Sequence, residues 1–187
     1  MRSVMHYRDR GLRLAVLLLA SIIILPVHAV TLNFSAFLIS GTCTFNLDKS
    51  TLDLGVVSVT QLQPSTLVNA QPFTLTVSAC TGTDMNLTPV VNISGEGITQ
   101  DGRWLFRTSD STTSNNMGVM LAKADVSPDY SATEIKNNED IVLAAQGVNP
   151  ADQNLTFYAG MTCGSTGCTG LQSGTLMARV LFQLAYR

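Results

Sequence analysis

Histidine is nearly absent from this chain of 187 residues: only His6 and His28 occur, both close to the start. Everything after residue 28 therefore lacks imidazole, which excludes Ser–His and Cys–His nucleophile pairs and imidazole metal ligation there. After residue 25 there is also no apolar run long enough to cross a bilayer. Neither a charge run nor a proline-rich linker divides residues 30–187, so this part is expected to form one domain.

The first 29 residues have the pattern of a secretory signal. Four arginines precede an apolar run from residue 14 to 25 that only Ser21 interrupts, and Val27-His28-Ala29 has the small-x-small form of a cleavage site. We expect cleavage after Ala29. A retained membrane anchor is the alternative, and the run is short for a span of about 20 residues.

Removal of the signal changes the charge balance. Four of the eleven Lys and Arg and one of the thirteen Asp and Glu precede residue 30, which leaves seven basic and twelve acidic residues and a net charge of −5. That sign argues against nucleic acid and against an anionic membrane surface as partners.

All four cysteines follow the predicted signal, and an even number in an exported protein implies disulfides. Three pairings are possible, and we favour Cys43–Cys80 with Cys163–Cys168. In the chain-entropy model these are worth roughly 3.5–4 and about 2 kcal/mol, respectively. A zinc site is the rival interpretation, which an oxidising compartment disfavours.

The last segment alternates apolar and polar residues, the pattern of a half-buried strand. The apolar positions are Leu176, Ala178, Val180, Phe182, Leu184 and Tyr186. A second series of the same period follows the signal, at Val30, Leu32, Phe34, Ala36 and Leu38. A strand with one apolar face needs a neighbour and a core, so a chain with such a strand at each end could share its edges with other chains.

Residues rich in β-formers recur along the rest of the chain. We predict strands at 51–59, 73–80, 87–93, 104–108, 119–124, 141–145, 155–161 and 175–186. Turn clusters separate them, among them 95–97, Asp101-Gly102 and 164–170, and no helix of ten residues is expected. Short strands at this spacing predict an all-β antiparallel sandwich of Ig-like topology.

Candidates for chemistry are weak. The adjacent Glu139 and Asp140 would point to opposite faces of a strand, so a solvated turn is the better interpretation. Trp104 and Tyr130 could stack on a sugar, although a lone Trp in a sandwich is more often part of the core. We therefore predict no catalytic residue, no metal and no cofactor, and we expect that the protein is not an enzyme.

Several stretches together match the subunits of one kind of bacterial fibre. They are residues 41–45 around Cys43, 73–80 ending in Cys80, 116–121 and 155–159. The most specific match is the ending, where Tyr186 is penultimate and Gly174 is fourteenth from the C-terminus. On these residues the chain resembles the pilin subunits of chaperone–usher fimbriae, such as type 1 and P fimbriae, over essentially all of 30–187.

The resemblance implies an incomplete Ig-like sandwich that lacks its last strand. Residues 30–40 would form a donor strand, spanning about 36 Å at 3.3 Å per residue, and residues 41–187 the incomplete body. The donor's side chains would be Val30, Leu32, Phe34, Ala36 and Leu38. The groove that receives a chaperone or donor strand would be marked by Gly174, Leu176, Ala178, Val180, Phe182, Leu184 and Tyr186.

The same resemblance implies the partners and the location. A periplasmic pilus chaperone would lend a strand, and the N-terminal segment of a neighbouring subunit would replace it at the outer-membrane usher. The product would be a fibre on the cell surface that supports adhesion. Two features depart from the family: Ala36 stands where a glycine is usual, and Cys163–Cys168 is additional to the usual single disulfide.

Two other functions remain open on the sequence. The first is a single-domain fimbrial adhesin that binds a host ligand through its loops, although a donor segment counts against a terminal tip subunit. The second is an exported enzyme, which the lack of histidine after the signal and of any nucleophile motif disfavours.

Overall fold

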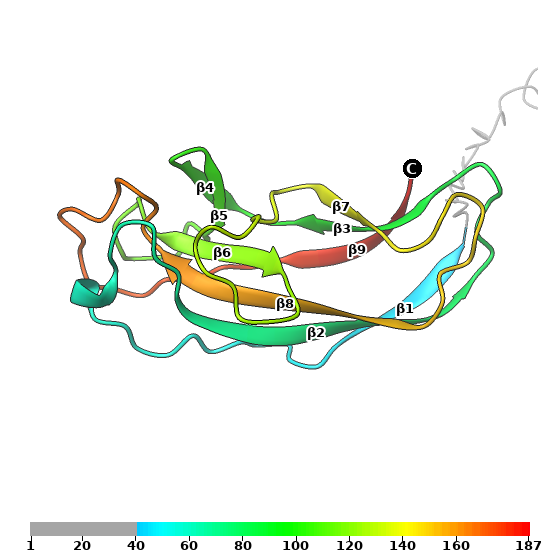
Figure 1. Ribbon diagram of the computed structural model, residues 1–187, viewed down its shortest axis with the longest axis horizontal. Coiled ribbons are helices and arrows are strands. Elements are labelled where there is room, and N and C mark those ends of the chain that lie inside the picture. The colour runs from blue at the N-terminus through cyan, green and yellow to red at the C-terminus, as the bar shows by residue number, and fades with distance from the viewer. Residues whose placement is uncertain (1–40) are drawn as a thin grey trace, which may run out of the picture. The chain divides into compact units, whose positions relative to one another are not determined.

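The computed structural model describes residues 41–187, and the predicted signal and donor segment lie outside the described residues (Figure 1). The described chain is built of antiparallel strands in two sheets. Its only helical element is the 3-10 turn η1 (Val59–Gln61). Among these residues there is no helix with the length and apolarity of a membrane span. The prediction of an all-β sandwich is confirmed.

The larger sheet has six strands, each antiparallel to its neighbours. In spatial order they are β1 (Thr42–Leu47), β2 (Val68–Thr81), β8 (Gln153–Thr162), β6 (Gly118–Lys123), β5 (Arg103–Phe106) and β4 (Gly97–Gln100). Asp101 and Gly102 join β4 to β5, and both have positive φ, as the tightest hairpin turns require.

The smaller sheet has three strands, with β3 (Pro89–Ser94) between β7 (Glu139–Val142) and β9 (Leu181–Tyr186). β9 pairs with β3 on one side only. Within residues 41–187, no strand lies against its other edge. An open edge of this kind exposes backbone donors and acceptors to any strand that approaches.

The core fills the space between the sheets. Alternate residues of β2 and β8 point inward, and Phe73 and Phe157 stack with ring centroids 5.5 Å apart. Phe182 of β9 meets Phe157 from the opposite sheet at 5.4 Å. Each side chain of this size contributes about 1.5–3 kcal/mol when fully buried. Phe182 is only half-buried, because the sandwich is not closed on that side.

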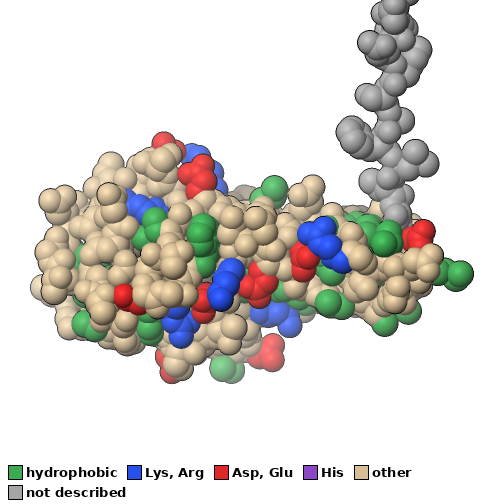
Figure 2. Space-filling view, turned by 90° about the horizontal axis from the view of Figure 1, so that it is seen from above, with side chains coloured by type: hydrophobic (Ala, Val, Ile, Leu, Met, Phe, Trp, Pro, Cys, Tyr) green, Lys and Arg blue, Asp and Glu red, His purple; other side chains and the backbone are tan. Residues whose placement is uncertain are grey.

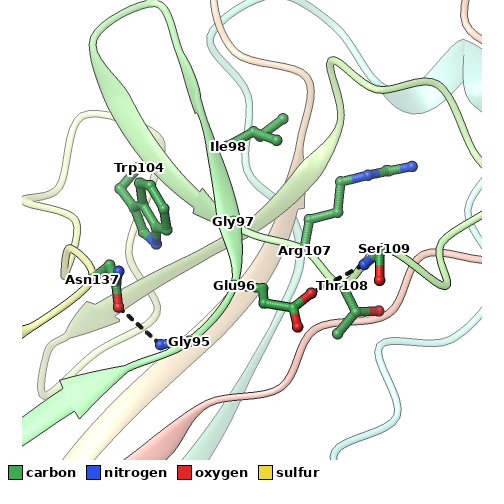
Figure 3. Close-up of a pocket in the computed structure, with 9 residues that line it drawn as sticks. All are labelled: Gly95, Glu96, Gly97, Ile98, Trp104, Arg107, Thr108, Ser109 and Asn137. Atoms are coloured by element: carbon green, nitrogen blue, oxygen red, sulfur yellow. Dashed lines mark hydrogen bonds between the residues drawn. The ribbon is translucent and has the colours of Figure 1, made fainter.

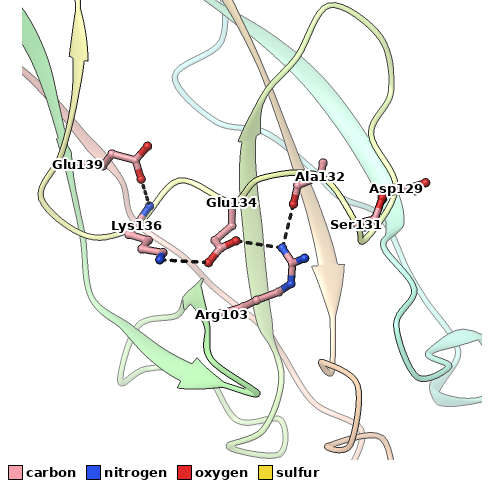
Figure 4. Close-up of polar contacts among 7 residues, drawn as sticks. All are labelled: Arg103, Asp129, Ser131, Ala132, Glu134, Lys136 and Glu139. Atoms are coloured by element: carbon pink, nitrogen blue, oxygen red, sulfur yellow. Dashed lines mark hydrogen bonds and ion pairs between the residues drawn. The ribbon is translucent and has the colours of Figure 1, made fainter.

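The long connection from β6 to β7 covers the outer face of the larger sheet (Figure 4). Arg103 of β5 donates to the Glu134 carboxylate at 2.9 Å and to the Ala132 carbonyl at 2.8 Å. The Arg103 guanidinium also lies 4.7 Å from the centre of the Tyr130 ring. Tyr130 thus packs against the sheet and is buried.

Both disulfides form with the pairing that the sequence favoured. Cys43–Cys80 joins β1 to β2, across a sequence separation of 37 residues. Cys163–Cys168 closes a short loop directly after β8. In Figure 1 this loop, in orange, lies at the same end as η1, whereas the C-terminus and the start of β1 lie at the opposite end.

Most strand predictions are confirmed with shifted ends. Those at 73–80, 87–93, 104–108, 119–124, 141–145 and 155–161 correspond to β2, β3, β5, β6, β7 and β8. β1 and β4 are absent from the predicted strands, β4 because Gly97 was assigned to a turn. Glu139 and Asp140 begin β7 instead of forming a solvated turn. Two predictions are wrong in extent: residues 51–59 lie in no strand, and of residues 175–186 only 181–186 belong to one.

Candidate binding groove

A groove of about 1010 Å³ runs between the two segments whose strand predictions were wrong. One wall is formed by residues 47–59, from the last residue of β1 onward, and the other by residues 172–182, which lead into the start of β9. The floor is apolar and comes from the larger sheet and its connections: Leu62, Phe73, Phe106, Met117, Val119, Leu121, Ala159 and Met161. A groove of this length and lining suits an extended apolar ligand.

The second wall carries the alternating series found in the sequence. Leu176, Ala178, Val180, Phe182 and Leu184 pack against the core, and each remains half-buried. Of the seven predicted groove residues, Gly174 and the first four of this series line the groove. Leu184 and Tyr186 lie further along β9 and do not line it. The structure thus brings five of the seven together.

The backbone of this wall is paired on its outer side. Thr112 N donates to the Thr175 carbonyl and Thr108 N to the Met177 carbonyl, both at 2.8 Å. Arg187, another odd-numbered residue, exchanges two hydrogen bonds with Thr88 beside β3. Because backbone groups of an extended chain point alternately to its two sides, the even-numbered residues face the groove.

Those even-numbered residues lack backbone partners. Leu176, Ala178 and Val180 make no backbone hydrogen bond to any other residue within 41–187. Unpaired N–H and C=O groups are costly where water is excluded. A strand laid into the groove would satisfy them and cover the half-buried side chains at the same time.

A buried arginine supports the outer side of this wall. Arg107 is 7% exposed, and its guanidinium donates to Thr113 Oγ1 and to the carbonyls of Ser111, Thr113, Ser114 and Met117. Burial lowers the pKa of Arg107 from its ordinary value. The 108–117 loop is thereby held in the shape that pairs with Thr175 and Met177. No pattern in the sequence indicated this role.

The first wall, residues 47–59, has less regular contacts with the rest of the body than the second. Leu52, Leu54 and Val57 point toward the core, while Val56 is almost fully exposed. The Leu54 carbonyl accepts a hydrogen bond from Asn69 Nδ2 at 2.9 Å. Alternation of burial is present in both walls, as the sequence indicated, but a strand also needs a paired neighbour. The two wrong predictions therefore fall on segments that alternate in burial but lie in no strand within residues 41–187.

Tyr186 lies at the opposite end of β9 from the groove. Its ring is half-buried, and its hydroxyl is buried with no hydrogen-bond partner among the described residues. A Cβ atom on Gly41 would clash with that hydroxyl. Gly41, with a φ of 148°, therefore allows Tyr186 to pack against the start of the described body.

A second cavity, of about 640 Å³, lies beside the β4–β5 hairpin (Figure 3). Trp104 lines it, with the indole against Gly97 and its Nε1 unpaired among the described residues. Glu96 accepts from Ser109 N at 3.3 Å, and Asn137 Oδ1 accepts from Gly95 N at 3.0 Å. Tyr130 does not line this cavity, so the two aromatic residues singled out in the sequence are not brought together.

Charges are scattered over the surface. Figure 2 shows acidic and basic side chains interspersed on the displayed face, with no broad area of one sign. Between residues 41 and 187 no group of three or more side chains is arranged to hold a metal ion.

The described residues thus form an all-β sandwich with an open apolar groove beside the segment that leads into its last strand. The model of the fimbrial protein family matches residues 32–187, and the chain belongs to this family. The family is structural and non-enzymatic, and its members are pilus subunits that polymerise with their neighbours in a surface fimbrium. The resemblance noted in the sequence is confirmed.

Solved structures that are similar to this chain include two from pili. One is a chain from a chaperone–usher pilus studied for rod uncoiling, with 14% identity, 87% of this chain and 98% of that chain covered, and a TM-score of 0.49. The other is the P pilus rod subunit PapA, with 15% identity, 84% and 100% covered, and a TM-score of 0.45. A comparison with curated protein sequences finds no match.

Proposed function

We propose that this pilus subunit polymerises by donor-strand exchange, in which its groove receives an extended strand from another polypeptide. The observation that carries the proposal is the row of unpaired backbone groups at Leu176, Ala178 and Val180, which face an apolar groove. In β-strand addition, main-chain hydrogen bonds provide affinity and alternate side chains fill the apolar positions.

The donor in the fibre is residues 30–40 of a neighbouring subunit. This segment has eleven residues, as does the wall from residue 172 to 182, so each spans about 36 Å when extended. Its five alternate apolar side chains match an apolar floor. Since donor and groove are different surfaces, the contact is head to tail and builds a fibre.

Before assembly, a periplasmic chaperone lends a strand to the same groove, and the neighbour's segment replaces it at the outer-membrane usher. The finished fimbrium supports adhesion. The open edge of β9 supports this proposal, because an exposed apolar groove with unpaired backbone groups promotes aggregation unless another chain covers it.

Thermal melts of residues 30–187 that carry Phe34→Asp in their own donor segment, with and without a synthetic peptide of residues 30–40, test the proposal. We expect the peptide to raise the melting temperature, because it binds only the folded groove. A matched peptide with Phe34→Asp should have no effect, since an unpaired carboxylate would be buried. Equal melting temperatures with and without the parent peptide would exclude donor-strand completion by this segment.

A second candidate function is binding of a host carbohydrate in the cavity beside Trp104. The favouring observation is that an indole, a carboxylate and an amide converge on one opening, which is a common set for sugar recognition. Trp104 is the only tryptophan, so its fluorescence reports on this cavity alone. Glycans that leave its emission unchanged at millimolar concentration would eliminate the candidate.

A further inference from the structure

One end of the groove differs from the rest in what lies behind it. Six residues line the groove and also belong to or pack against a second, smaller core cluster, and we call this set the end pocket; two of them, Leu54 and Leu176, contact the main core as well. The six are Leu54, Val57, Leu62, Met117, Met161 and Leu176. The remaining members of that cluster do not line the groove, and they include both sulfurs of the Cys163–Cys168 disulfide.

The disulfide packs directly behind the end pocket. Cys163 is fully buried, and Cys168 and Leu171 pack against the same cluster. Cys168 stands only four residues before Gln172, where the second wall begins. The disulfide therefore fixes the start of that wall relative to the end of β8.

The disulfide loop is tied to three other segments. The Asp101 carboxylate of the β4–β5 turn accepts from Ser165 N at 2.6 Å and from Thr166 N at 2.8 Å. The Gly164 carbonyl accepts from Ser65 N at 2.9 Å, and Ser65 lies three residues after Leu62 of the end pocket. Asn116 donates its side-chain amide to the Gly167 carbonyl.

These ties reach the end pocket from both sides. Asn116 directly precedes Met117, which is 4% exposed and forms part of the pocket. Gln172 N donates to Ser114 Oγ at 2.6 Å, which joins the 108–117 loop to the beginning of the second wall. The disulfide loop, through these hydrogen bonds, thus fixes the distance between Met117 and Leu176. It thereby also fixes the size of the end pocket.

We propose that the Cys163–Cys168 loop supports the end pocket from behind and makes this pocket selective for the size of one apolar side chain of the donor. This inference rests on the proposed function. Every strand pair in the described body is antiparallel, and an antiparallel donor places its C-terminal residues beside Leu176. The last apolar residue of the donor series is Leu38, which is therefore the occupant.

A double-mutant cycle tests the proposal. The protein is residues 30–187 with Phe34→Asp in its own donor segment, so that it does not polymerise, compared with the same chain carrying Cys163→Ala and Cys168→Ala. Labelled peptides of residues 30–40 are titrated in three forms: parent, Leu38→Ala and Val30→Ala. The measured quantity is the dissociation constant of each peptide.

With the disulfide intact, Leu38→Ala should weaken binding about tenfold to a hundredfold, the range for removing a buried leucine side chain. Without the disulfide, the same change should weaken binding less than about threefold. Val30→Ala should have the same effect on both proteins, which also shows that the double variant is folded. Equal losses at Leu38 in both proteins would overturn the inference. Absence of any binding to the disulfide-intact protein would instead overturn the proposed function.

A second variant tests the pocket while keeping the disulfide. Met117→Phe should reduce the space for Leu38 and weaken binding of the parent peptide about tenfold. The Leu38→Ala peptide should then bind the variant more tightly than the parent peptide does. This is the reverse of the order of affinities expected for the protein that keeps Met117. An unchanged ranking would show that Leu38 does not enter this pocket.

Discussion

The two ends of the groove are built in different ways. Between the walls, Phe73, Phe106, Val119 and Leu121 form a floor that belongs to the main core, and we call this part the core half. The end pocket rests instead on three loops and a disulfide. The core half takes its shape from the sandwich itself. The end pocket takes its shape from loop contacts, so its selectivity can vary without repacking the core.

The largest effect is expected in the core half. Phe106 is fully buried and lines the groove, so Phe106→Ala should lower the free energy of unfolding by about 3–5 kcal/mol. Denaturant titration of the peptide-bound protein measures it. The control is Met117→Ala in the end pocket, which should fall at the low end of the range for such truncations, about 2 kcal/mol. A larger loss at Met117 than at Phe106 would contradict the distinction between the two regions.

The two disulfides should separate stability from binding. Replacing Cys43 and Cys80 by Ala should cost roughly 3.5–4 kcal/mol of unfolding free energy, because a long loop is released, and replacing Cys163 and Cys168 about 2 kcal/mol. The loss of peptide affinity should follow the opposite order. It should be larger when Cys163 and Cys168 are replaced, because only that disulfide lies behind the groove. Urea melts and peptide titrations of the same two variants measure both. A loss of affinity in the first variant alone would reverse this assignment.

A smaller effect is expected at Arg107, which holds the 108–117 loop on the side of the second wall that faces away from the groove. Arg107→Met should lower the free energy of unfolding by about 1.5–3 kcal/mol, because hydrogen bonds from a charged donor to loop carbonyls are lost. Amide hydrogen exchange should accelerate at Thr112 and Met117 before it does in β2. Arg103→Met, which removes contacts on the outer face of the larger sheet, is the control and should leave these amides protected. Unchanged exchange at Thr112 would show that the loop holds its shape without Arg107.

The sequence predicted the parts of the fold that depend on local pattern. Alternating residues in β2, β8 and β9 identify strands because one face of each is buried. The favoured disulfide pairing, which joins cysteines that are neighbours along the chain, is also the one that forms. β4 was missed because glycines lie at its start and just before it, and its four residues give too short a pattern.

The candidate site was predictable only in part, for a physical reason. The alternation at residues 176–182 was visible, but the pairing of strands is a property of neighbours in space, so the unpaired edges at 51–59 and 175–180 could not be read from it. Arg107 and the disulfide loop act through contacts between residues distant in sequence. Their positions near the groove have no local signature, which is why the sequence assigned no role to Cys163–Cys168.

The smallest effects should come from two carboxylates, one in β7 and one beside the disulfide loop. Asp140 of β7 has its pKa lowered mainly by a hydrogen bond from Arg187 at 2.6 Å and also by Asn92. Asp101 has its pKa lowered mainly by the side-chain and backbone hydrogen bonds of Thr166. Each carboxylate has a folded-state pKa below the unfolded value of about 3.9. Its contribution to the free energy of unfolding is therefore fully present above about pH 3.9 and is lost as the pH falls through the folded-state pKa.

Acid titration of the two asparagine variants should therefore distinguish these two places. Asp140→Asn should remove part of the acid dependence of unfolding below about pH 4, yet leave discrimination between the parent and the Leu38→Ala peptides unchanged, because it lies away from the end pocket. Asp101→Asn should also flatten the acid dependence, and it should reduce that discrimination at neutral pH, since the disulfide loop loses a charged acceptor. Unfolding midpoints from strongly acidic to neutral pH, with peptide titrations at neutral pH, measure both. Loss of discrimination in the Asp140 variant alone would place control of the end pocket in the C-terminal strand instead of in the disulfide loop.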